Sequence, residues 1–291
     1  MQNSPYTTLI TVDQLKNLMH PDSPGAPAVM VFDCSFDLMN PASGEAAYLV
    51  AHIPGAIYVH LDRELSDKSG QGVNGGRHPL PSREKFAAWL GQTGFNNAMQ
   101  AVVYDRQGVN YAGRLWWMLK WAGHDNVAVL DGGFQAWQTS EPVNAALPPP
   151  RPVTTFAVKP PQSRLVNTQS VENNLGRPAQ TLLDARAAAR FRGEVEPLDP
   201  VAGHIPGALN RPFGQNMGAD GKFKPATVLR AEFDALLAGR DPATVVHHCG
   251  SGVSAVPNVI AMELAGLGRT ALYAGSWSEW SSDASHAFAQ G

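Results

Sequence analysis

Two stretches of the chain, residues 51–56 and 203–208, read Ala-His-Ile-Pro-Gly-Ala and Gly-His-Ile-Pro-Gly-Ala. Two further pairs of similar segments follow in the same order and at nearly the same spacing. They are Val-Val-Tyr-Asp at 102–105 with Val-Val-His-His-Cys at 245–249, and Asp-Gly-Gly-Phe-Gln-Ala-Trp at 131–137 with Ala-Gly-Ser-Trp-Ser-Glu-Trp at 274–280. An ordered internal repeat of this kind indicates one structural unit that occurs twice.

The length of the chain agrees with two units. Its 291 residues, of which 44% are hydrophobic, suffice for two domains that each bury a core. Between the repeats, the proline-rich residues 147–152 and 159–161 are typical of a stiff, extended connector. We therefore predict an N-terminal domain over residues 1–140, a linker over residues 141–162 and a C-terminal domain over residues 163–291.

Each half shows the pattern of an α/β fold. Short apolar runs end at Asp33 and Asp184, as buried parallel strands do when a polar residue stands at their carboxyl end. The apolar runs at 101–104 and 244–248 are each followed by a glycine-containing turn and then by apolar residues at helical spacing. Because strand, turn and helix recur in this order, we predict two tandem domains, each a mainly parallel sheet flanked by helices.

Charge and hydropathy limit the range of partners. The 22 basic and 25 acidic side chains nearly cancel, and no basic run suggests a surface for nucleic acid or an anionic membrane. No segment approaches the roughly 18 apolar residues of a membrane-spanning helix, and residues 1–11 lack the features of a secretory signal. We expect a cytoplasmic protein with a small-molecule partner and with neither a nucleic-acid nor a membrane partner.

The two cysteines, Cys34 and Cys249, differ in their surroundings. Cys34 follows a predicted strand without a glycine turn, so we expect a buried core residue. Cys249 begins the sequence Cys-Gly-Ser-Gly-Val-Ser at the carboxyl end of a predicted strand, where open α/β sheets bind ligands. The glycines let amide N–H groups turn toward the sulfur, and the following helix adds its positive end. Such surroundings stabilise a thiolate, which makes Cys249 the candidate nucleophile.

Two other kinds of cysteine site fit less well. A cysteine phosphatase needs an arginine six positions after the nucleophile to bind the phosphoryl oxygens, but that position is Ala255. His247 and His248 precede the cysteine, yet adjacent strand residues point to opposite faces, and the spacing typical of a zinc site is missing. We predict no metal site.

These motifs together resemble those of the two-domain rhodanese family of sulfurtransferases, over roughly residues 6–282. Thiosulfate-specific members carry basic residues after the cysteine, whereas the loop here resembles the 3-mercaptopyruvate branch, with Ser254 in place of its usual threonine. The resemblance implies that Cys249 takes the sulfur of 3-mercaptopyruvate as a persulfide and releases pyruvate. The persulfide then passes the sulfur to a thiol acceptor such as thioredoxin or a small thiol, without a metal or organic cofactor.

The resemblance also implies a set of substrate-binding residues. Arg190 maps to the arginine that contacts the substrate in the family, and a guanidinium suits a carboxylate. Arg186 is a second candidate, although an arginine just after a strand is more often structural. The family's further substrate arginine follows a Glu-Pro pair, where this chain has Leu198, so that contact is lost; Arg192 and Arg211 are candidates to replace it, without a motif that supports either. The loop residues are the remaining candidates: Gly250, Ser251, Gly252, Val253 and Ser254.

A Ser-His-Asp arrangement is also implied, with Ser251, His78 and Asp62 as its members and Asp67 as a competitor of Asp62. A histidine oriented by a carboxylate can move a proton during the reaction. The N-terminal half carries Asp105 where the other half has Cys249. Because a carboxylate cannot carry a persulfide, we expect this half to be non-catalytic.

Two alternatives to the 3-mercaptopyruvate reaction remain open. One is a thiosulfate sulfurtransferase with an atypical loop. The other is a non-enzymatic rhodanese-like module that binds a protein partner or senses oxidants through Cys249. The intact cysteine loop together with Arg190 favours an enzyme, because a module that only binds has no need of them.

Overall fold

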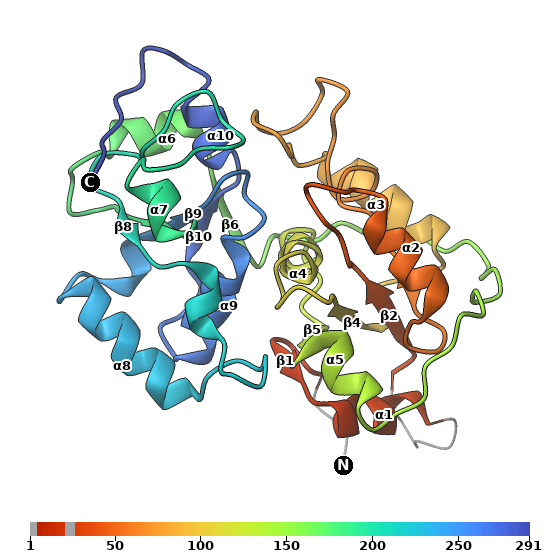
Figure 1. Cartoon of the computed structure of the whole chain (residues 1–291). Coiled ribbons are helices and arrows are strands. Elements are labelled where there is room, and N and C mark those ends of the chain that lie inside the picture. Colours follow the sequence, from red (N-terminus) through yellow and green to blue (C-terminus); the bar gives the residue numbers. More distant parts are fainter. Residues whose placement is uncertain (1–4, 21–26) are drawn as a thin grey trace. The chain divides into compact units, whose positions relative to one another are not determined.

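The computed structural model describes residues 5–20 and 27–291, which form two compact units (Figure 1). The first unit comprises the described residues up to Leu65, together with Pro81–Gln162 and Ala219–Lys222. The second comprises Ser66–Leu80, Ser163–Gly218 and Phe223–Gly291. The segment Ser66–Leu80 therefore packs with the second unit, although it lies within the first half of the sequence. The first four residues of the polar stretch 1–11 lie outside the described part of the chain.

In the described part of the first unit, a five-stranded parallel sheet has the order β1-β5-β4-β2-β3. Its strands are β1 (Leu9–Ile10), β2 (Val29–Asp33), β3 (Ile57–Tyr58), β4 (Gln100–Tyr104) and β5 (Val127–Leu130). The helices of this unit are α1 (Val12–Met19), α2 (Ser43–Val50), α3 (Arg83–Gln92), α4 (Ala112–Trp121) and α5 (Gly133–Gln138).

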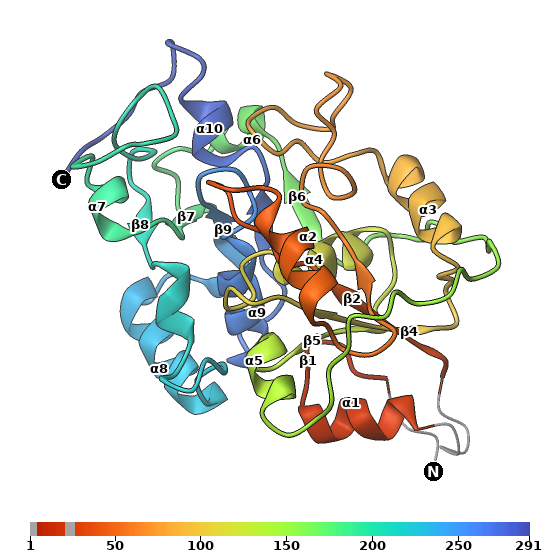
Figure 2. The ribbon, with the colours of Figure 1, turned by 45° about the vertical axis from the view of Figure 1, so that its right-hand side comes forward.

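The second unit repeats this topology with the order β6-β10-β9-β7-β8, again all parallel. Its strands are β6 (Arg164–Val166), β7 (Thr181–Asp184), β8 (Leu209–Asn210), β9 (Val245–His248) and β10 (Ala271–Tyr273). The helices are α6 (Thr168–Asn173), α7 (Ala188–Phe191), α8 (Ala226–Leu237), α9 (Val256–Leu264) and α10 (Ser276–Trp280), and α8 packs beside α9 (Figure 2). The predicted pair of α/β domains with parallel sheets is confirmed.

The central strands are buried because both faces of each sheet are covered. All residues of β4 and β9 are buried, and both strands are rich in β-branched valine. In the second sheet, Asp184 at the end of β7 is paired in register with His248 at the end of β9. Cys249 therefore leaves the sheet at the carboxyl edge of a central strand, as predicted.

The repeated His-Ile-Pro-Gly motif has the same local structure in both units. His52 stacks on Tyr48, with its Nδ1 2.7 Å from the carbonyl oxygen of that residue, and His204 stacks on Phe191 with a corresponding distance of 2.8 Å. The following isoleucines, at positions 53 and 205, are both 0% exposed. The His-Ile-Pro-Gly motif therefore has a packing role, because its buried isoleucine anchors a loop to the core of each unit.

No helix within residues 5–20 and 27–291 is long and apolar enough to cross a lipid bilayer.

Replacing the core isoleucine of the second motif, Ile205→Ala, is expected to lower the free energy of unfolding of the second unit by about 2–5 kcal/mol, because it leaves a cavity. Urea denaturation followed by circular dichroism measures this loss. Val195→Ala is the control, because that side chain is 53% exposed, and its effect should stay within about 0.5 kcal/mol. Equal effects of the two substitutions would contradict the packing role.

Candidate functional site

Cys249 begins the loop between β9 and α9, and its side chain is 1% exposed. Its backbone N–H donates to the hydroxyl of Ser276 at 3.1 Å, and its carbonyl oxygen accepts from the N–H of Trp277 at 3.0 Å. The carbonyl oxygen of Gly250 accepts from the N–H of Ser278 at 2.8 Å. The first residues of α10 therefore hold the start of the loop. They belong to the segment Ala-Gly-Ser-Trp-Ser-Glu-Trp at 274–280, which is the second copy of a repeated segment.

The corresponding loop of the first unit shows what such a backbone can bind. Both carboxylate oxygens of Asp105 accept two backbone hydrogen bonds each, at 2.8–3.0 Å, from the N–H groups of Gln107, Val109, Tyr111 and Ala112. Burial raises the pKa of the Asp105 carboxyl, and the four N–H donors oppose that rise. The loop thus encloses one acidic side chain in a ring of amides.

The Cys249 loop has the same length and the same backbone kink. Asp105 precedes the start of α4 by as many residues as Cys249 precedes the start of α9, and Gly108 and Gly252 both have positive φ. In the described part of the chain, no acceptor bonds the N–H groups of Ser251 and Val253, which are equivalent to two of the donors that bind Asp105. These two N–H groups are thus left for an acceptor other than the protein's own groups.

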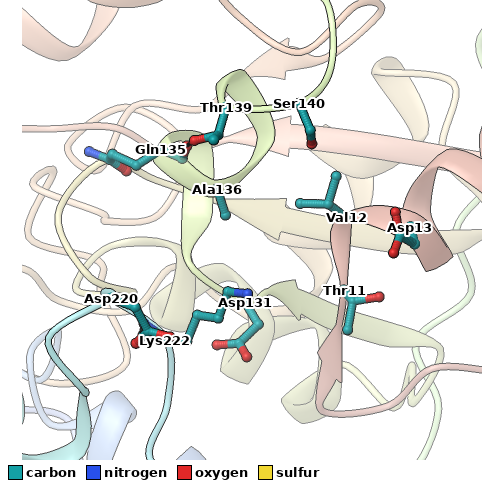
Figure 3. A pocket seen from close by; sticks show the side chains of 10 residues that line it. All are labelled: Thr11, Val12, Asp13, Asp131, Gln135, Ala136, Thr139, Ser140, Asp220 and Lys222. Carbon is teal, nitrogen blue, oxygen red and sulfur yellow. Dashed lines mark hydrogen bonds between the residues drawn. The ribbon is translucent and has the colours of Figure 1, made fainter.

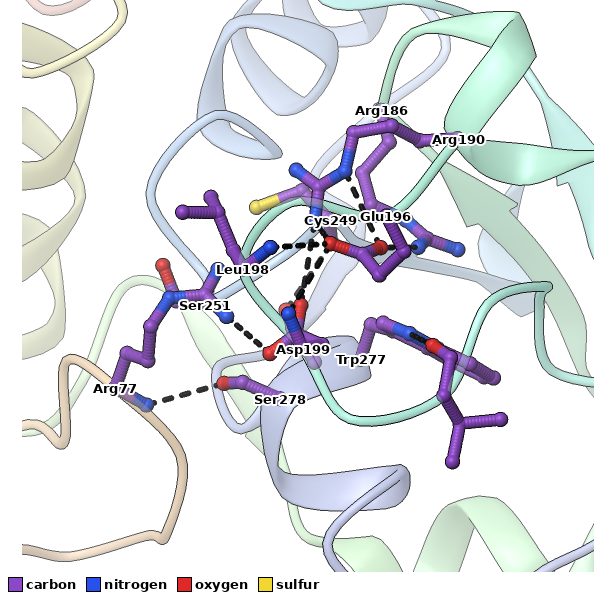
Figure 4. Close-up of polar contacts among 12 residues, drawn as sticks. Arg77, Arg186, Arg190, Glu196, Leu198, Asp199, Cys249, Ser251, Trp277 and Ser278 are labelled. Atoms are coloured by element: carbon purple, nitrogen blue, oxygen red, sulfur yellow. Dashed lines mark hydrogen bonds and ion pairs between the residues drawn. The ribbon is translucent and has the colours of Figure 1, made fainter. Parts of the chain in front are cut away.

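Ser251 and His78 come together in the second unit. The hydroxyl oxygen of Ser251 lies 2.7 Å from Nδ1 of His78, and both residues are buried. The segment that carries His78 is bound to α10, because the N–H of Gly75 donates to Glu279 at 3.0 Å. The N–H of Arg77 donates to the hydroxyl of Ser278 at 3.0 Å, as Figure 4 shows. Two of the predicted site residues are thus hydrogen-bonding neighbours.

The two candidate aspartates lie in different units. Asp67 belongs to the second unit with His78, where its N–H donates to the carbonyl oxygen of Pro79 and its carboxylate accepts from Ser69. Asp62 belongs to the first unit, where its N–H donates to Nδ1 of His60 at 3.1 Å.

Arg186 is surrounded by protein acceptors. Its guanidinium donates to the carboxylates of Asp184 and Glu196 and to the carbonyl oxygen of Gly203, and it lies over the ring of Trp277. Its side chain is only 2% exposed, and each of its three guanidinium nitrogens has a protein acceptor. The geometry favours the structural alternative for this arginine.

Arg190 is more accessible, with a side chain 18% exposed. It donates from Nε and Nη2 to Glu196, at 3.2 and 2.6 Å, and from Nη2 to Asp199 at 3.2 Å (Figure 4). The Glu196 carboxylate also accepts from the N–H groups of Leu198 and Asp199, so it organises the loop after the Glu-Pro pair.

The two suggested replacements for the lost arginine have other partners. Arg192 pairs with Glu194 at 2.6 Å with a side chain 45% exposed, and Arg211 pairs with Glu232 at 2.7 Å. Sequence reasoning missed Arg77, whose Nη2 lies 2.8 Å from the point that a Cβ atom on Gly250 would occupy. The only available signal was its position directly before His78.

His247 and His248 are fully buried in β9. Burial lowers the pKa of His247 to about 3, and burial also lowers the pKa of His248 despite the opposing carboxylate of Asp184. Both imidazoles are therefore neutral at pH 7 and supply no positive charge beside Cys249. Within residues 5–20 and 27–291, no cluster of three or more potential metal ligands occurs.

Cys34 is buried, with 1% exposure. Burial raises the pKa of its thiol far above the ordinary value, and the nearby carboxylates of Asp105 and Asp33 raise it further. The thiol is therefore protonated at neutral pH and poorly nucleophilic, which agrees with the predicted core role.

A surface cavity of about 550 Å³ opens in the first unit beside the carboxyl ends of β1 and β5 (Figure 3). Its charged side chains are those of Asp13, Asp131, Asp220 and Lys222. None of the predicted site residues lines it.

Known proteins resemble the chain over almost its whole length. Residues 11–140 and 167–283 each match the rhodanese-like domain. A probable 3-mercaptopyruvate sulfurtransferase of Pseudomonas aeruginosa is 44% identical, over 94% of this chain and 95% of that protein. A putative thiosulfate sulfurtransferase of Mycobacterium tuberculosis is 40% identical, over 94% of both chains. The structure of a 3-mercaptopyruvate sulfurtransferase from Leishmania major superposes with a TM-score of 0.78 at 28% identity, covering 97% of this chain and 76% of that one.

The loop geometry makes Gly252→Ala a sensitive substitution. Gly252 has φ 73°, and an added Cβ would lie 2.2 Å from the carbonyl oxygen of Ala274, so the free energy of unfolding is expected to fall by about 2 kcal/mol or more. Thermal and urea denaturation measure this loss, together with the rate at which iodoacetamide modifies Cys249.

Gly214→Ala is the matched control, because an added Cβ at Gly214 meets open space. It should change the free energy of unfolding by no more than about 0.5 kcal/mol. A Gly252→Ala variant as stable as this control would show that the loop does not depend on the left-handed kink.

Proposed function

This chain belongs to the rhodanese-like family of sulfurtransferases, and from that premise we propose that it transfers the sulfur of 3-mercaptopyruvate, by way of a persulfide on Cys249, to a thiol acceptor. The observation that carries the proposal is the Cys249 loop. Its backbone resembles that of the loop that surrounds the Asp105 carboxylate in the first unit, and it holds a thiol in place of that carboxylate. In the described part of the chain, the N–H groups of Ser251 and Val253 have no acceptor.

The first half-reaction begins with the thiolate of Cys249. It attacks the sulfur of 3-mercaptopyruvate, a bond forms between the two sulfurs, and the carbon–sulfur bond breaks with its electron pair passing to carbon. The resulting enolate of pyruvate takes up the proton that the substrate thiol gives up. The products are pyruvate and a persulfide anion, which the loop N–H donors stabilise as an oxyanion hole stabilises negative charge. The step needs no external oxidant or reductant.

Ser251 and His78 suit the proton transfer of this step. Their 2.7 Å contact allows a proton to pass between the hydroxyl and the imidazole. Placed at the substrate carbonyl, this pair would polarise the carbonyl oxygen as the enolate forms, and then return a proton to carbon.

The second half-reaction regenerates the enzyme. A thiolate of the acceptor, such as thioredoxin or a small thiol, attacks the outer sulfur of the persulfide, and Cys249 leaves as a thiolate. The transferred atom stays covalently attached throughout, so the two half-reactions are separate in time. Neither half-reaction requires a metal or an organic cofactor.

Thiosulfate transfer is the second candidate function, and the thiosulfate sulfurtransferase name of the mycobacterial relative favours it. Against it stands the absence of Lys and Arg from residues 249–254. Release of sulfite from thiosulfate requires no proton transfer to carbon, so the Ser251 and His78 pair would have no proton-transfer role in that reaction.

Turnover of the two donors decides between these functions. We expect pyruvate release from 3-mercaptopyruvate with a thiol acceptor to exceed thiocyanate formation from thiosulfate and cyanide in kcat/KM. Cys249→Ser should abolish both reactions, whereas Cys34→Ser should retain both. A preference for thiosulfate would contradict the proposed substrate, and activity that survives in Cys249→Ser would contradict the persulfide route.

The proton-transfer role predicts a selective effect of His78→Gln and Ser251→Ala. Each should lower kcat for 3-mercaptopyruvate by about 10²- to 10⁴-fold, because a positioned acid–base group is lost. The rate of persulfide formation from thiosulfate should change by only a few-fold in the same variants. Equal losses with both donors would point to a general structural role for the pair.

A further inference from the structure

We propose that Arg77 is a substrate-binding residue that, together with Arg190, binds the carboxylate of the substrate and thereby determines specificity for a keto acid. This assignment rests on the proposed function and identifies how the carboxylate is recognised. It also supplies the second arginine that the sequence around Leu198 lacks.

The two arginines share one buried carboxylate. Nη1 of Arg77 pairs with Oδ1 of Asp199, and Nη2 of Arg190 donates to Oδ2 of the same residue at 3.2 Å (Figure 4). The Asp199 side chain is 3% exposed, whereas those of Arg77 and Arg190 are 27% and 18% exposed. The shared carboxylate thus fixes two partly accessible guanidinium groups beside each other.

Both guanidinium groups face the cysteine loop. From the point that a Cβ atom on Gly250 would occupy, Nη2 of Arg77 lies at 2.8 Å and Nη1 of Arg190 at 3.5 Å. A residue with any side chain at position 250 would compete with Arg77 for this space. The guanidinium of Arg77, from a distant segment of the sequence, therefore occupies the space that a side chain at position 250 of the loop would fill.

Hydrogen-bonding capacity remains on the side that faces the loop. A guanidinium has five N–H donors, and in the described part of the chain neither Nη2 of Arg77 nor Nη1 of Arg190 has an acceptor. Arg186, in contrast, has all its nitrogens bonded within the protein. The free NH₂ groups of two guanidiniums suit the two oxygens of one carboxylate.

Charge balance favours a monoanionic group at this point. With Arg186 included, the cluster has three guanidinium groups, and the carboxylates of Asp184, Glu196 and Asp199 balance their charge. It therefore offers directed hydrogen bonds and little excess positive charge. A carboxylate uses such directed donors well, whereas a dianion benefits more from excess charge. The same pair therefore recognises the substrate carboxylate and discriminates between donors.

The test compares two sulfur donors that differ only in the carboxylate, 3-mercaptopyruvate and 1-mercaptopropan-2-one. Sulfide release in the presence of a dithiol acceptor reports on both. Arg77→Ala should lower kcat/KM for 3-mercaptopyruvate by about 10- to 100-fold, mainly through KM, because a charge-assisted hydrogen bond is lost. With the donor that lacks a carboxylate, the same variant should stay within about twofold of the wild type, which also shows that it is folded.

Arg192→Ala is the matched control, because Arg192 is an exposed arginine two positions after Arg190 and pairs with Glu194. It should leave both donors unaffected. An Arg77→Ala variant with unchanged kcat/KM, or with an equal loss for both donors, would overturn this assignment while leaving the proposed function intact. A wild-type protein that releases no pyruvate from 3-mercaptopyruvate would overturn the proposed function and this assignment with it.

Discussion

The site depends on one constraint, the need of the loop after a central strand to satisfy its own backbone N–H groups. In the first unit these groups bind the carboxylate of Asp105, which satisfies them permanently. In the second unit Cys249 stands at the same position, and in the described part of the chain the N–H groups of Ser251 and Val253 have no acceptor. The two copies of this loop share Gly108/Gly252 and Val109/Val253 but differ at their first residue, where an acidic side chain that binds the amides of its own loop is replaced by a thiol.

Buried carboxylates organise the surroundings of that loop. Asp184 and Glu196 bind Arg186 in the interior, and Glu196 and Asp199 orient Arg190. An ion pair formed away from water stabilises the protein only when its geometry is good and its remaining hydrogen bonds are satisfied. Here those ion pairs also determine which guanidinium nitrogens remain for a ligand.

Much of the fold and part of the site followed from local pattern. The repeat, the parallel strands and the position of Cys249 at a strand end depend on hydrophobic periodicity and turn residues, which are local properties of the chain. The role of Arg186 remained open because pairing with a carboxylate cannot be distinguished from ligand binding by spacing alone. Arg77 was missed because nothing local indicates that residues 66–80 pack with the second unit.

The sequence by itself determined two α/β units, the candidate nucleophile and the absence of a second cysteine loop, since each depends on residue types at fixed spacing. Only the tertiary structure decided which side chains surround the loop. It brought His78 to Ser251 and placed Arg77 over Gly250, across long separations in the chain. The physical reason is that hydrogen bonds between Ser66–Leu80 and α10 depend on three-dimensional packing, which short-range periodicity does not encode.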